Sequence, residues 1–340
     1  MPAAASPTFR LSPRAVGVAA AVITVLVWTG FIIVARASAA RSLSPLDLAV
    51  ARILGASLVL VPWGAWLVAQ QRRAAGAERG SLFGLSPLSL RLSALAGIFG
   101  GVAYAVLAYS GFFFAPAAHA SVLLPGSLPL WTALLAALVL GDRITPLRAA
   151  GLALIVAGDL LVGGRSLLHA FEGGDVWKGD LLFMSAAFSW ACYSIIVRRN
   201  ALDAVRTTIA ITVFALLTYV PVYALLAGAG VLHSRLPAAP WSEIAFQMGF
   251  QGVGSVVISG ITFTKMIGYF GPVRSTMITA LVPGLSALGA VLFLGEPMHW
   301  TLIAGLALVT AGILFGVQRT AIKKVAVGAI PAGAGGRFDA

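Results

Sequence analysis

Charged residues are scarce in this chain. Asp, Glu, Lys and Arg together make up 10% of the 340 residues, and 59% of the residues are hydrophobic. An ordinary soluble domain has roughly 25% charged residues, and so few charges could not cover the surface of a soluble protein. The composition therefore excludes a soluble globular enzyme and a disordered chain, and it indicates a helical protein that crosses a membrane many times.

Cysteine is almost absent as well. Cys192 is the only one, so the chain has no internal disulfide and no cysteine cluster for a metal. The four histidines are widely scattered, and neither a His-Glu-x-x-His arrangement nor a phosphate-binding Gly-x4-Gly-Lys-Ser/Thr loop occurs. We therefore expect no metal, no cofactor and no ATPase domain on this chain. The lack of clustered polar residues also argues against an enzyme.

Basic residues outnumber acidic ones, which gives a formal net charge of +12. In a soluble chain such a charge would suggest a nucleic-acid partner. Here the Lys and Arg residues lie between apolar runs, which is typical of the cytoplasmic loops of membrane proteins. We therefore expect the partners to be the lipid bilayer and a small-molecule substrate, and no nucleic acid.

Ten apolar segments follow one another along the chain, each about long enough to cross a ~30 Å hydrocarbon core as a helix. Between Arg91 and Asp142 no charged residue occurs, and this stretch is too long for one span, so we place a turn at 115–117. The fold class predicted is an all-α polytopic membrane protein with ten transmembrane helices. The segments are 15–36, 46–69, 92–114, 118–140, 147–164, 179–198, 207–232, 243–267, 273–294 and 299–318.

The positions of the basic residues predict the orientation. With the N-terminus inside, 17 of the 23 Lys and Arg residues fall on the inner side and five on the outer side, while Arg52 lies within a span. Cytoplasmic loops collect basic residues, so both termini are expected in the cytoplasm. The first apolar stretch is longer than the ~7–15 residues of a signal-peptide core, and we interpret it as an uncleaved span.

Several residues of the first half of the chain recur in the second half at a constant spacing. Five spans per half is an odd number, so the second half must enter the membrane upside down, an arrangement that is typical of secondary transporters. A tryptophan also precedes an arginine by eight residues in each half, at Trp28 and at Trp190. Leu128-Pro129, Leu140-Gly141-Asp142, Gly151 and Gly158 recur 154 residues later as Val282-Pro283, Leu294-Gly295-Glu296, Gly305 and Gly312.

Two five-span halves that each close with Pro-(x)11-Gly-acid and a Gly-rich span resemble the EamA type of the drug/metabolite transporter superfamily. The resemblance covers about residues 15–318. The matching stretches are Ala120–Arg143 and Gly271–Pro297, with Trp28-Thr29-Gly30 and Ala51-Arg52 in the first half and Gly179-Asp180 and Ser189-Trp190-Ala191 in the second.

We accordingly divide the chain into two EamA-like five-helix repeats, at 15–164 and 179–318, joined by an outer linker at 165–178. A cytoplasmic N-terminus at 1–14 precedes them. A Gly- and Ala-rich cytoplasmic tail at 319–340, which we expect to be disordered, follows them.

The resemblance implies a central cavity between the halves and alternating access. We predict a secondary transporter that exports a small polar metabolite such as an amino acid, as a monomer or homodimer. The Arg-, Ala- and Gly-rich composition is typical of a GC-rich bacterial genome, which places the protein in a bacterial inner membrane. Three alternatives stay open: a membrane-embedded enzyme that acts on lipid, a channel or receptor-like scaffold, and a carrier of nucleosides, sugars or phosphometabolites.

Arg52 is the sharpest signal among candidate binding residues. It lies inside the second span, where a charge costs at least ~2.5–3.5 kcal/mol on insertion scales, so it must meet a partner, water or a substrate anion. We interpret it as a candidate anchor for a carboxylate or phosphate. The alternatives are an arginine that reaches the outer interface, or one that pairs with Asp47 or Asp159.

Trp28 and Trp190 lie in the middle of their spans, away from the interfaces where membrane tryptophans usually serve as anchors. We interpret both as candidate walls of a substrate cavity, where an aromatic face can stack on the substrate. Tyr193 is close to Trp190 in the sequence and is a further candidate. The alternative for all three is packing within the helix bundle.

Proton coupling and hinge motion have candidates of their own. His119, at the start of the fourth span, could titrate near physiological pH, and Asp159 is an acid well inside an apolar run. The alternatives are helix capping for His119 and charge balance for Asp159.

Pro125 and Pro129 lie in the fourth span, and Pro283 matches Pro129 in the ninth. Because proline kinks helices, we interpret these three as candidate hinges, against prolines that the helices merely tolerate.

Overall fold

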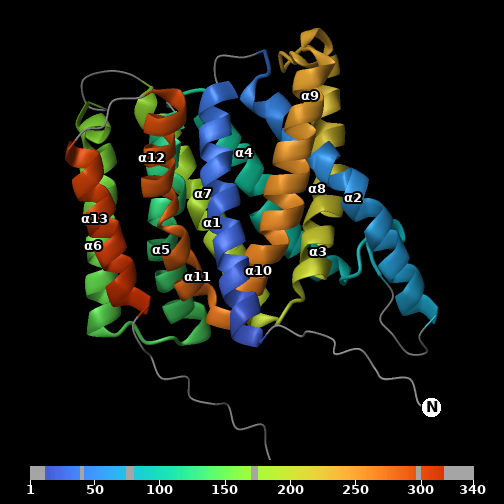
Figure 1. Cartoon of the computed structure of the whole chain (residues 1–340). Helices are drawn as coiled ribbons and strands as arrows, with labels where there is room; N and C mark the ends of the chain where they lie inside the picture. The colour runs from blue at the N-terminus through green and yellow to red at the C-terminus, as the bar shows by residue number, and fades with distance from the viewer. Residues whose placement is uncertain are drawn as a thin grey trace, which may run out of the picture.

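A computed structural model describes residues 12–38, 42–73, 80–115, 117–169, 175–295 and 300–317 (Figure 1). The predicted tail at 319–340 and most of the predicted N-terminal segment lie outside these ranges. The described chain is helical apart from loops and an isolated β-bridge between Ser81 and Ser86.

The first half contains five spans, of which the third is made of three consecutive helical segments. Its elements are α1 (Pro13–Ser38), α2 (Pro45–Arg73), η1 (Leu82–Gly84), α3 (Leu90–Gly97), η2 (Ile98–Val102), α4 (Ala103–Gly111), α5 (Ala117–Leu140) and α6 (Pro146–His169). The second half is α7 (Val176–Arg199), α8 (Ala204–Gly228), η4 (Leu236–Ala238), α9 (Trp241–Gln247), η5 (Met248–Ile258), α10 (Ser259–Phe270), α11 (Pro272–Thr279), α12 (Val282–Leu294) and α13 (Trp300–Val317).

Ten apolar helical stretches correspond to the ten predicted segments. Within the described ranges, eight helices are long and apolar enough to cross a membrane, and α6 and α13 contain two shorter apolar helices, Pro146–Gly158 and Ile303–Gly312. The predicted turn is present, since α4 ends at Gly111 and α5 begins at Ala117. The prediction of an all-α polytopic membrane fold is confirmed.

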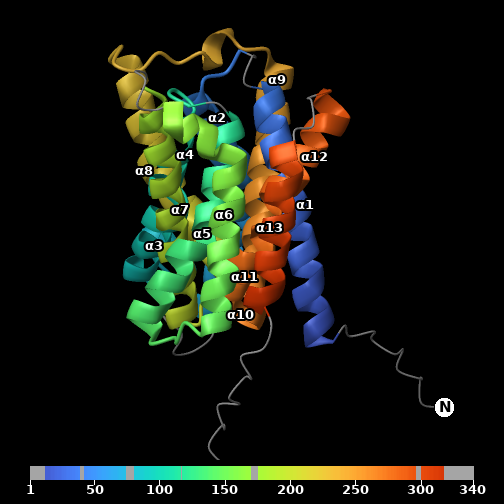
Figure 2. The same cartoon turned by 90° about the vertical axis from the view of Figure 1, so that its left-hand side faces the viewer.

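The two halves are related by inversion. In Figures 1 and 2, α5 ends at the lower end of the bundle, whereas α12, which closes the equivalent ninth span, ends at the upper end. The first described helix begins and the last one ends at the lower end. Helices α6 and α13, which close the two halves, pack closely against each other along one side of the bundle.

Spans three and eight share a feature that the sequence did not predict. Each contains a π-helical segment, η2 in span three and η5 in span eight, whose turns are wider than those of an α-helix. Such segments occur frequently at functional sites. Both contribute residues to the centre of the bundle, from opposite halves of the chain.

The matching prolines do not have matching geometry. Helix α5 runs without a break through Pro125 and Pro129, whereas the ninth span is interrupted between Thr279 and Val282. Pro283 lies in the first turn of α12, where its missing N–H is not needed. The matching prolines therefore lie in different local structures, Pro129 within a continuous helix and Pro283 just after a helix break, and their role as hinges stays a prediction.

Candidate functional site

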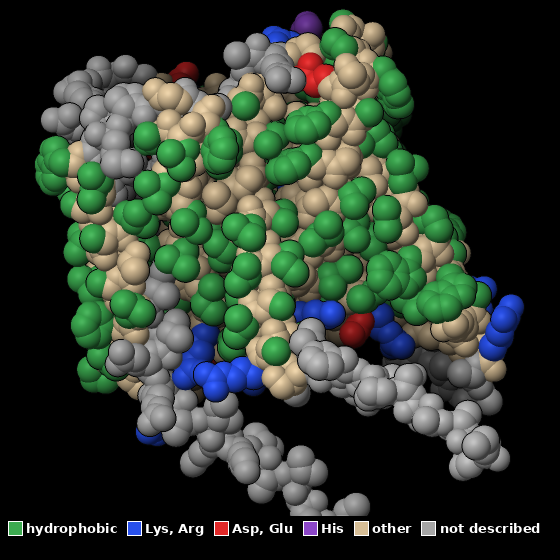
Figure 3. All heavy atoms as spheres, viewed as in Figure 1, with side chains coloured by type: hydrophobic (Ala, Val, Ile, Leu, Met, Phe, Trp, Pro, Cys, Tyr) green, Lys and Arg blue, Asp and Glu red, His purple; other side chains and the backbone are tan. Residues whose placement is uncertain are grey.

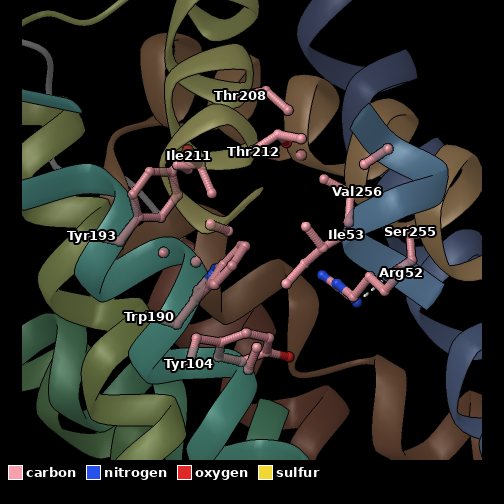
Figure 4. Close-up of a pocket in the computed structure, with 16 residues that line it drawn as sticks. Arg52, Ile53, Tyr104, Trp190, Tyr193, Thr208, Ile211, Thr212, Ser255 and Val256 are labelled. Carbon is pink, nitrogen blue, oxygen red and sulfur yellow. Dashed lines mark hydrogen bonds between the residues drawn. The ribbon is translucent and has the colours of Figure 1, made fainter. Parts of the chain in front are cut away.

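Two adjoining pockets lie at the centre of the bundle, where the two halves meet (Figure 4). They contain about 550 Å³ and 560 Å³ of space not filled by atoms. Arg52, Tyr104, Trp190 and Ser255 line both of them. The walls are otherwise mostly apolar, and in this conformation each pocket leaves room for a few water molecules.

Arg52 enters this space from α2 and is 9% exposed. Its Nη1 donates a hydrogen bond of 3.1 Å to the Ser255 hydroxyl on η5, and its guanidinium carbon lies 6.0 Å from the centre of the Phe31 ring. In the part of the chain that the structure describes, no carboxylate lies within ion-pair distance of Arg52. A guanidinium has five N–H donors, so Arg52 keeps donors for an anion.

Close packing of the backbones brings Arg52 and Ser255 together. A Cβ built on Gly55 of α2 would come within 2.1 Å of the Met248 carbonyl oxygen, and one on Gly252 of η5 would come within 2.6 Å of the Ala56 nitrogen. A side chain at either glycine would therefore push α2 and η5 apart. The two glycines set the short reach from the Arg52 side chain to Ser255.

Asp47 does not pair with Arg52. Its buried carboxylate accepts hydrogen bonds from the backbone N–H of Ser44 at 2.8 Å, from that of Arg235 at 3.1 Å, and from the Tyr223 hydroxyl. Five residues along an α-helix correspond to a rotation of about 140°, so Asp47 and Arg52 leave α2 in different directions. The pairing considered from the sequence is wrong for this acid.

Asp159 and His119 were the two candidates for proton coupling. Their helices are described, but their side chains lie outside what the structure describes. Helix α6, which carries Asp159, packs against α13 and α5, and Figures 1 and 2 show it on the far side of the bundle from α2. Proton coupling through these residues stays a prediction.

An aromatic cluster lines the pockets beside Arg52. The Trp190 ring of α7 lies at its centre, with ring centroids 4.8 Å from Tyr104, 5.1 Å from Tyr193 and 5.9 Å from Trp28. The indole N–H of Trp28 donates to the Ser259 hydroxyl at 3.1 Å. The Tyr193 hydroxyl shares a hydrogen bond of 2.6 Å with Thr264. The structure therefore brings all four predicted binding residues, Arg52 included, to one central site.

Two polar groups that face the first pocket have no hydrogen-bond partner among the described residues. They are the indole N–H of Trp190, whose side chain is 8% exposed, and the hydroxyl of Thr212, at 2% exposure. Figure 4 shows both residues and Arg52 around the same space. Buried polar groups normally find a partner. A ligand with hydrogen-bonding atoms would supply partners for these two.

Sequence reasoning missed Tyr104, Thr212 and Ser255. One signal could have found Ser255: span eight carries polar residues at every fourth position, a stripe that is unusual in an apolar segment. Each member of the stripe forms a hydrogen bond with a side chain of the first half of the chain; the members are Gln247, Gln251, Ser255 and Ser259. Of the predicted hinges, Pro125 lines the second pocket, whereas Pro129 and Pro283 are not among the described lining residues of either pocket.

Comparison with known protein families gives the two-repeat arrangement a name. The model of the EamA-like transporter family matches residues 15–164 and 177–317. The chain belongs to this family. The family is one of membrane transporters, so a small-molecule substrate and a lipid bilayer are the partners that membership implies.

Sequence identity to individual relatives is low. The chain is 25% identical over 237 residues to "Uncharacterized transporter YyaM" of Bacillus subtilis, covering 68% of this chain and 75% of that protein. It is 28% identical over 218 residues to "Probable amino-acid metabolite efflux pump" of Escherichia coli, covering 61% and 71%. A solved structure, titled "Crystal structure of protein", covers 88% of this chain and 96% of its own at a TM-score of 0.62 and 20% identity, which shows a shared fold.

Proposed function

We propose that this EamA-family transporter is a secondary exporter of an amino acid or a closely related small carboxylate. The observation that carries the proposal is the buried Arg52, placed in the central pocket without a carboxylate partner among the described residues. The name of the Escherichia coli relative, an amino-acid metabolite efflux pump, supports the same class of substrate.

The lining of the pockets fits the two ends of an amino acid. A carboxylate can accept two parallel hydrogen bonds from the Arg52 guanidinium, and the unpaired donors of Thr212 and Trp190 lie around the same space. An ammonium group gains from the faces of aromatic rings, which Tyr104 and Trp190 provide. The described lining of both pockets holds a single basic residue, which favours a monocarboxylate over a phosphometabolite with two negative charges.

Alternating access is the expected mechanism, because the pockets lie between two inverted repeats at 15–164 and 179–318 joined by the linker at 165–178. Span nine can bend at the break before Pro283. Spans three and eight can bend at their π-helical segments, η2 and η5. Pro125 and Pro129 would serve the same motion in α5.

The proposed orientation places both termini in the cytoplasm of a bacterial cell, with the protein in the inner membrane. Figure 3 shows Lys and Arg side chains gathered along the lower end of this face of the molecule, the end at which α1 begins and α13 ends. Cytoplasmic ends of membrane proteins are rich in basic residues. A reporter that is active only outside the cytoplasm, fused after Arg319, should stay silent, and activity there would overturn the orientation.

Counterflow in vesicles tests the function. Purified protein in liposomes loaded with an unlabelled amino acid should take up the same labelled amino acid without chemical change. Sugar phosphates and nucleosides should fail to drive this exchange. Exchange of a phosphometabolite in place of amino acids would overturn the substrate class, and formation of a new product in detergent would support the alternative of a lipid-modifying enzyme.

A further inference from the structure

A second cavity, separate from the central site, opens on the side of the bundle. It is a groove on α7 between α3 and α5, and Figure 2 shows α3 in the lower part of the molecule. Helices α3 and α5 each pack on α7. The groove encloses about 1290 Å³ of space not filled by atoms, part of which is open to the surroundings. Its lining includes Ser89, Arg91, Phe99, Cys192, Arg199 and Asn200, and its other lining residues are apolar.

The polar and apolar side chains of the groove are segregated along its length. Ser89 and Arg91 lie at the start of α3, and Arg199 and Asn200 lie at the end of α7, so all four meet at one end. Apolar side chains line the rest. Phe99 follows Arg91 by eight positions, which corresponds to a length of about 12 Å at 1.5 Å per residue. One leaflet of a bilayer has a hydrocarbon thickness of about 15 Å, so the apolar part has the length of a leaflet's acyl region.

The polar end carries two positive charges. Arg91 and Arg199 are both exposed, and within the described ranges neither has a carboxylate within ion-pair distance. Helix α3 begins and helix α7 ends at the lower end of the bundle, and Figure 3 shows basic side chains gathered at this end on the face that it draws. Basic pockets between membrane helices on the cytoplasmic side bind the headgroups of anionic lipids.

We propose that this groove binds an anionic phospholipid from the leaflet at the lower end of the bundle. Its phosphate contacts Arg91 and Arg199, Asn200 contacts the headgroup, and an acyl chain lies along the apolar wall towards Phe99. Charge complementarity at one end and the leaflet-length apolar wall together select this occupant. The inference does not depend on the identity of the transported substrate.

The groove shares a wall with the central site. Phe99 faces the groove, whereas the next residue, Gly100, lines the first central pocket. The backbone oxygen of Phe99 accepts a hydrogen bond of 2.8 Å from the Ser189 hydroxyl, one residue before Trp190. A lipid seated against Phe99 therefore contacts the π-helical segment η2 that forms part of the transport pocket.

Cys192 provides a built-in probe, because it is the only cysteine in the chain and it lines the groove. The experiment measures, by intact mass, the rate at which N-ethylmaleimide alkylates Cys192 in the full-length protein in neutral detergent. Phosphatidylglycerol should slow the reaction at concentrations at which phosphatidylcholine does not. In the variant that combines Arg91→Gln with Arg199→Gln, half-protection should need about 30-fold more phosphatidylglycerol, as expected when two arginines lose an anionic headgroup.

Arg143→Gln is the matched control, since Arg143 is exposed and lies outside the lining of the groove; it should keep the protection of the unmodified protein. Equal protection by the two lipids, protection by inorganic phosphate alone, or unchanged protection in the double variant would each overturn the proposal. Native mass spectrometry of the unmodified protein needs no variant: phosphatidylglycerol should remain bound in preference to phosphatidylcholine, and retention of both to the same extent would also overturn it.

Discussion

Gly158 of α6 lies directly against Gly305 of α13, so that a Cβ on Gly158 would come within 2.7 Å of the Gly305 carbonyl oxygen. The reciprocal pair has the same relationship, since a Cβ on Gly312 would come within 2.6 Å of the Gly151 carbonyl oxygen. Gly151 and Gly158 are the repeat equivalents of Gly305 and Gly312. A two-fold rotation that exchanges the repeats turns the pair Gly158–Gly305 into the pair Gly312–Gly151. The two contacts are therefore the ones expected for inverted repeats related by a two-fold axis.

Gly158→Ala should therefore weaken the packing of α6 on α13. A Cβ at 2.7 Å from a backbone atom forces the helices apart, and overpacking of this kind typically costs about 1–3 kcal/mol. The measurement is the thermal unfolding midpoint of the purified protein. Gly268→Ala is the matched control, because nothing lies within 4 Å of a Cβ at that position. Equal midpoints for the two variants would contradict the close packing.

Asp47→Asn should destabilise the fold without a loss of substrate affinity. The buried carboxylate accepts hydrogen bonds from two backbone N–H groups and from the Tyr223 hydroxyl, and hydrogen bonds to a charged group contribute about 1.5–3 kcal/mol each. An asparagine amide has one oxygen fewer to accept them. We expect a lower unfolding midpoint, with Asp142→Asn, at an exposed position, as the control. An unchanged unfolding midpoint together with weakened substrate binding would contradict this structural role.

The ten spans and the candidate anchor Arg52 could be predicted from the sequence because each is marked by a local sequence feature. A run of apolar residues predicts a span whatever it packs against, and a single charge such as Arg52 stands out within one. The repeat pattern was visible for the same reason, since glycine, proline and acid recur at a fixed spacing. These features needed no knowledge of which helices touch.

Contacts between spans were not accessible in this way. Whether Arg52 meets Asp47 depends on helical rotation, and the partner that the structure provides, Ser255, lies 203 residues away on η5. The unpaired donor of Trp190 could not be recognised either, since a tryptophan in an apolar run has no visible partner until its neighbours are placed. The π-helical segments η2 and η5 were not predicted either, because the spacing of apolar residues does not distinguish a π-helical turn from an α-helical one.

Replacing Pro129 and Pro283 together with alanine should slow transport and leave substrate binding largely intact. Alanine at 283 restores an N–H and allows α11 and α12 to continue as one helix, which stiffens span nine. The measurement compares the counterflow rate with the binding affinity of the same preparation. Pro221→Ala, at an exposed position within α8, is the control. An unchanged transport rate in the double variant would show that these prolines are passive.

Trp190→Phe should raise the KM for substrate by roughly 3- to 10-fold, the effect of losing one neutral hydrogen bond. Phenylalanine keeps an aromatic ring in the cluster and removes the indole N–H, which has no partner among the described residues. Trp177→Phe, at a position 44% exposed, should leave KM unchanged. If the KM of the Trp190 variant equals that of the unmodified protein, the indole N–H does not contact the substrate.

Arg52→Gln should reduce substrate affinity by at least about 10-fold while the protein inserts and folds normally. The loss of charge-assisted hydrogen bonds to a carboxylate accounts for the effect, and normal insertion follows because removal of an intramembrane charge eases it. Arg52→Lys should have an intermediate effect, since a point ammonium cannot reproduce a bidentate contact. Counterflow of a labelled amino acid measures both variants.

The control for Arg52 is Arg143→Gln, which removes an exposed arginine and should transport normally. Because Asp47 is bound by Ser44, Arg235 and Tyr223 rather than by Arg52, the combination of Arg52→Gln with Asp47→Asn should lower stability as much as Asp47→Asn alone. If that combination rescues the yield of folded protein, Arg52 and Asp47 form a structural pair after all. Transport at the unmodified rate in Arg52→Gln would instead remove Arg52 as the substrate anchor.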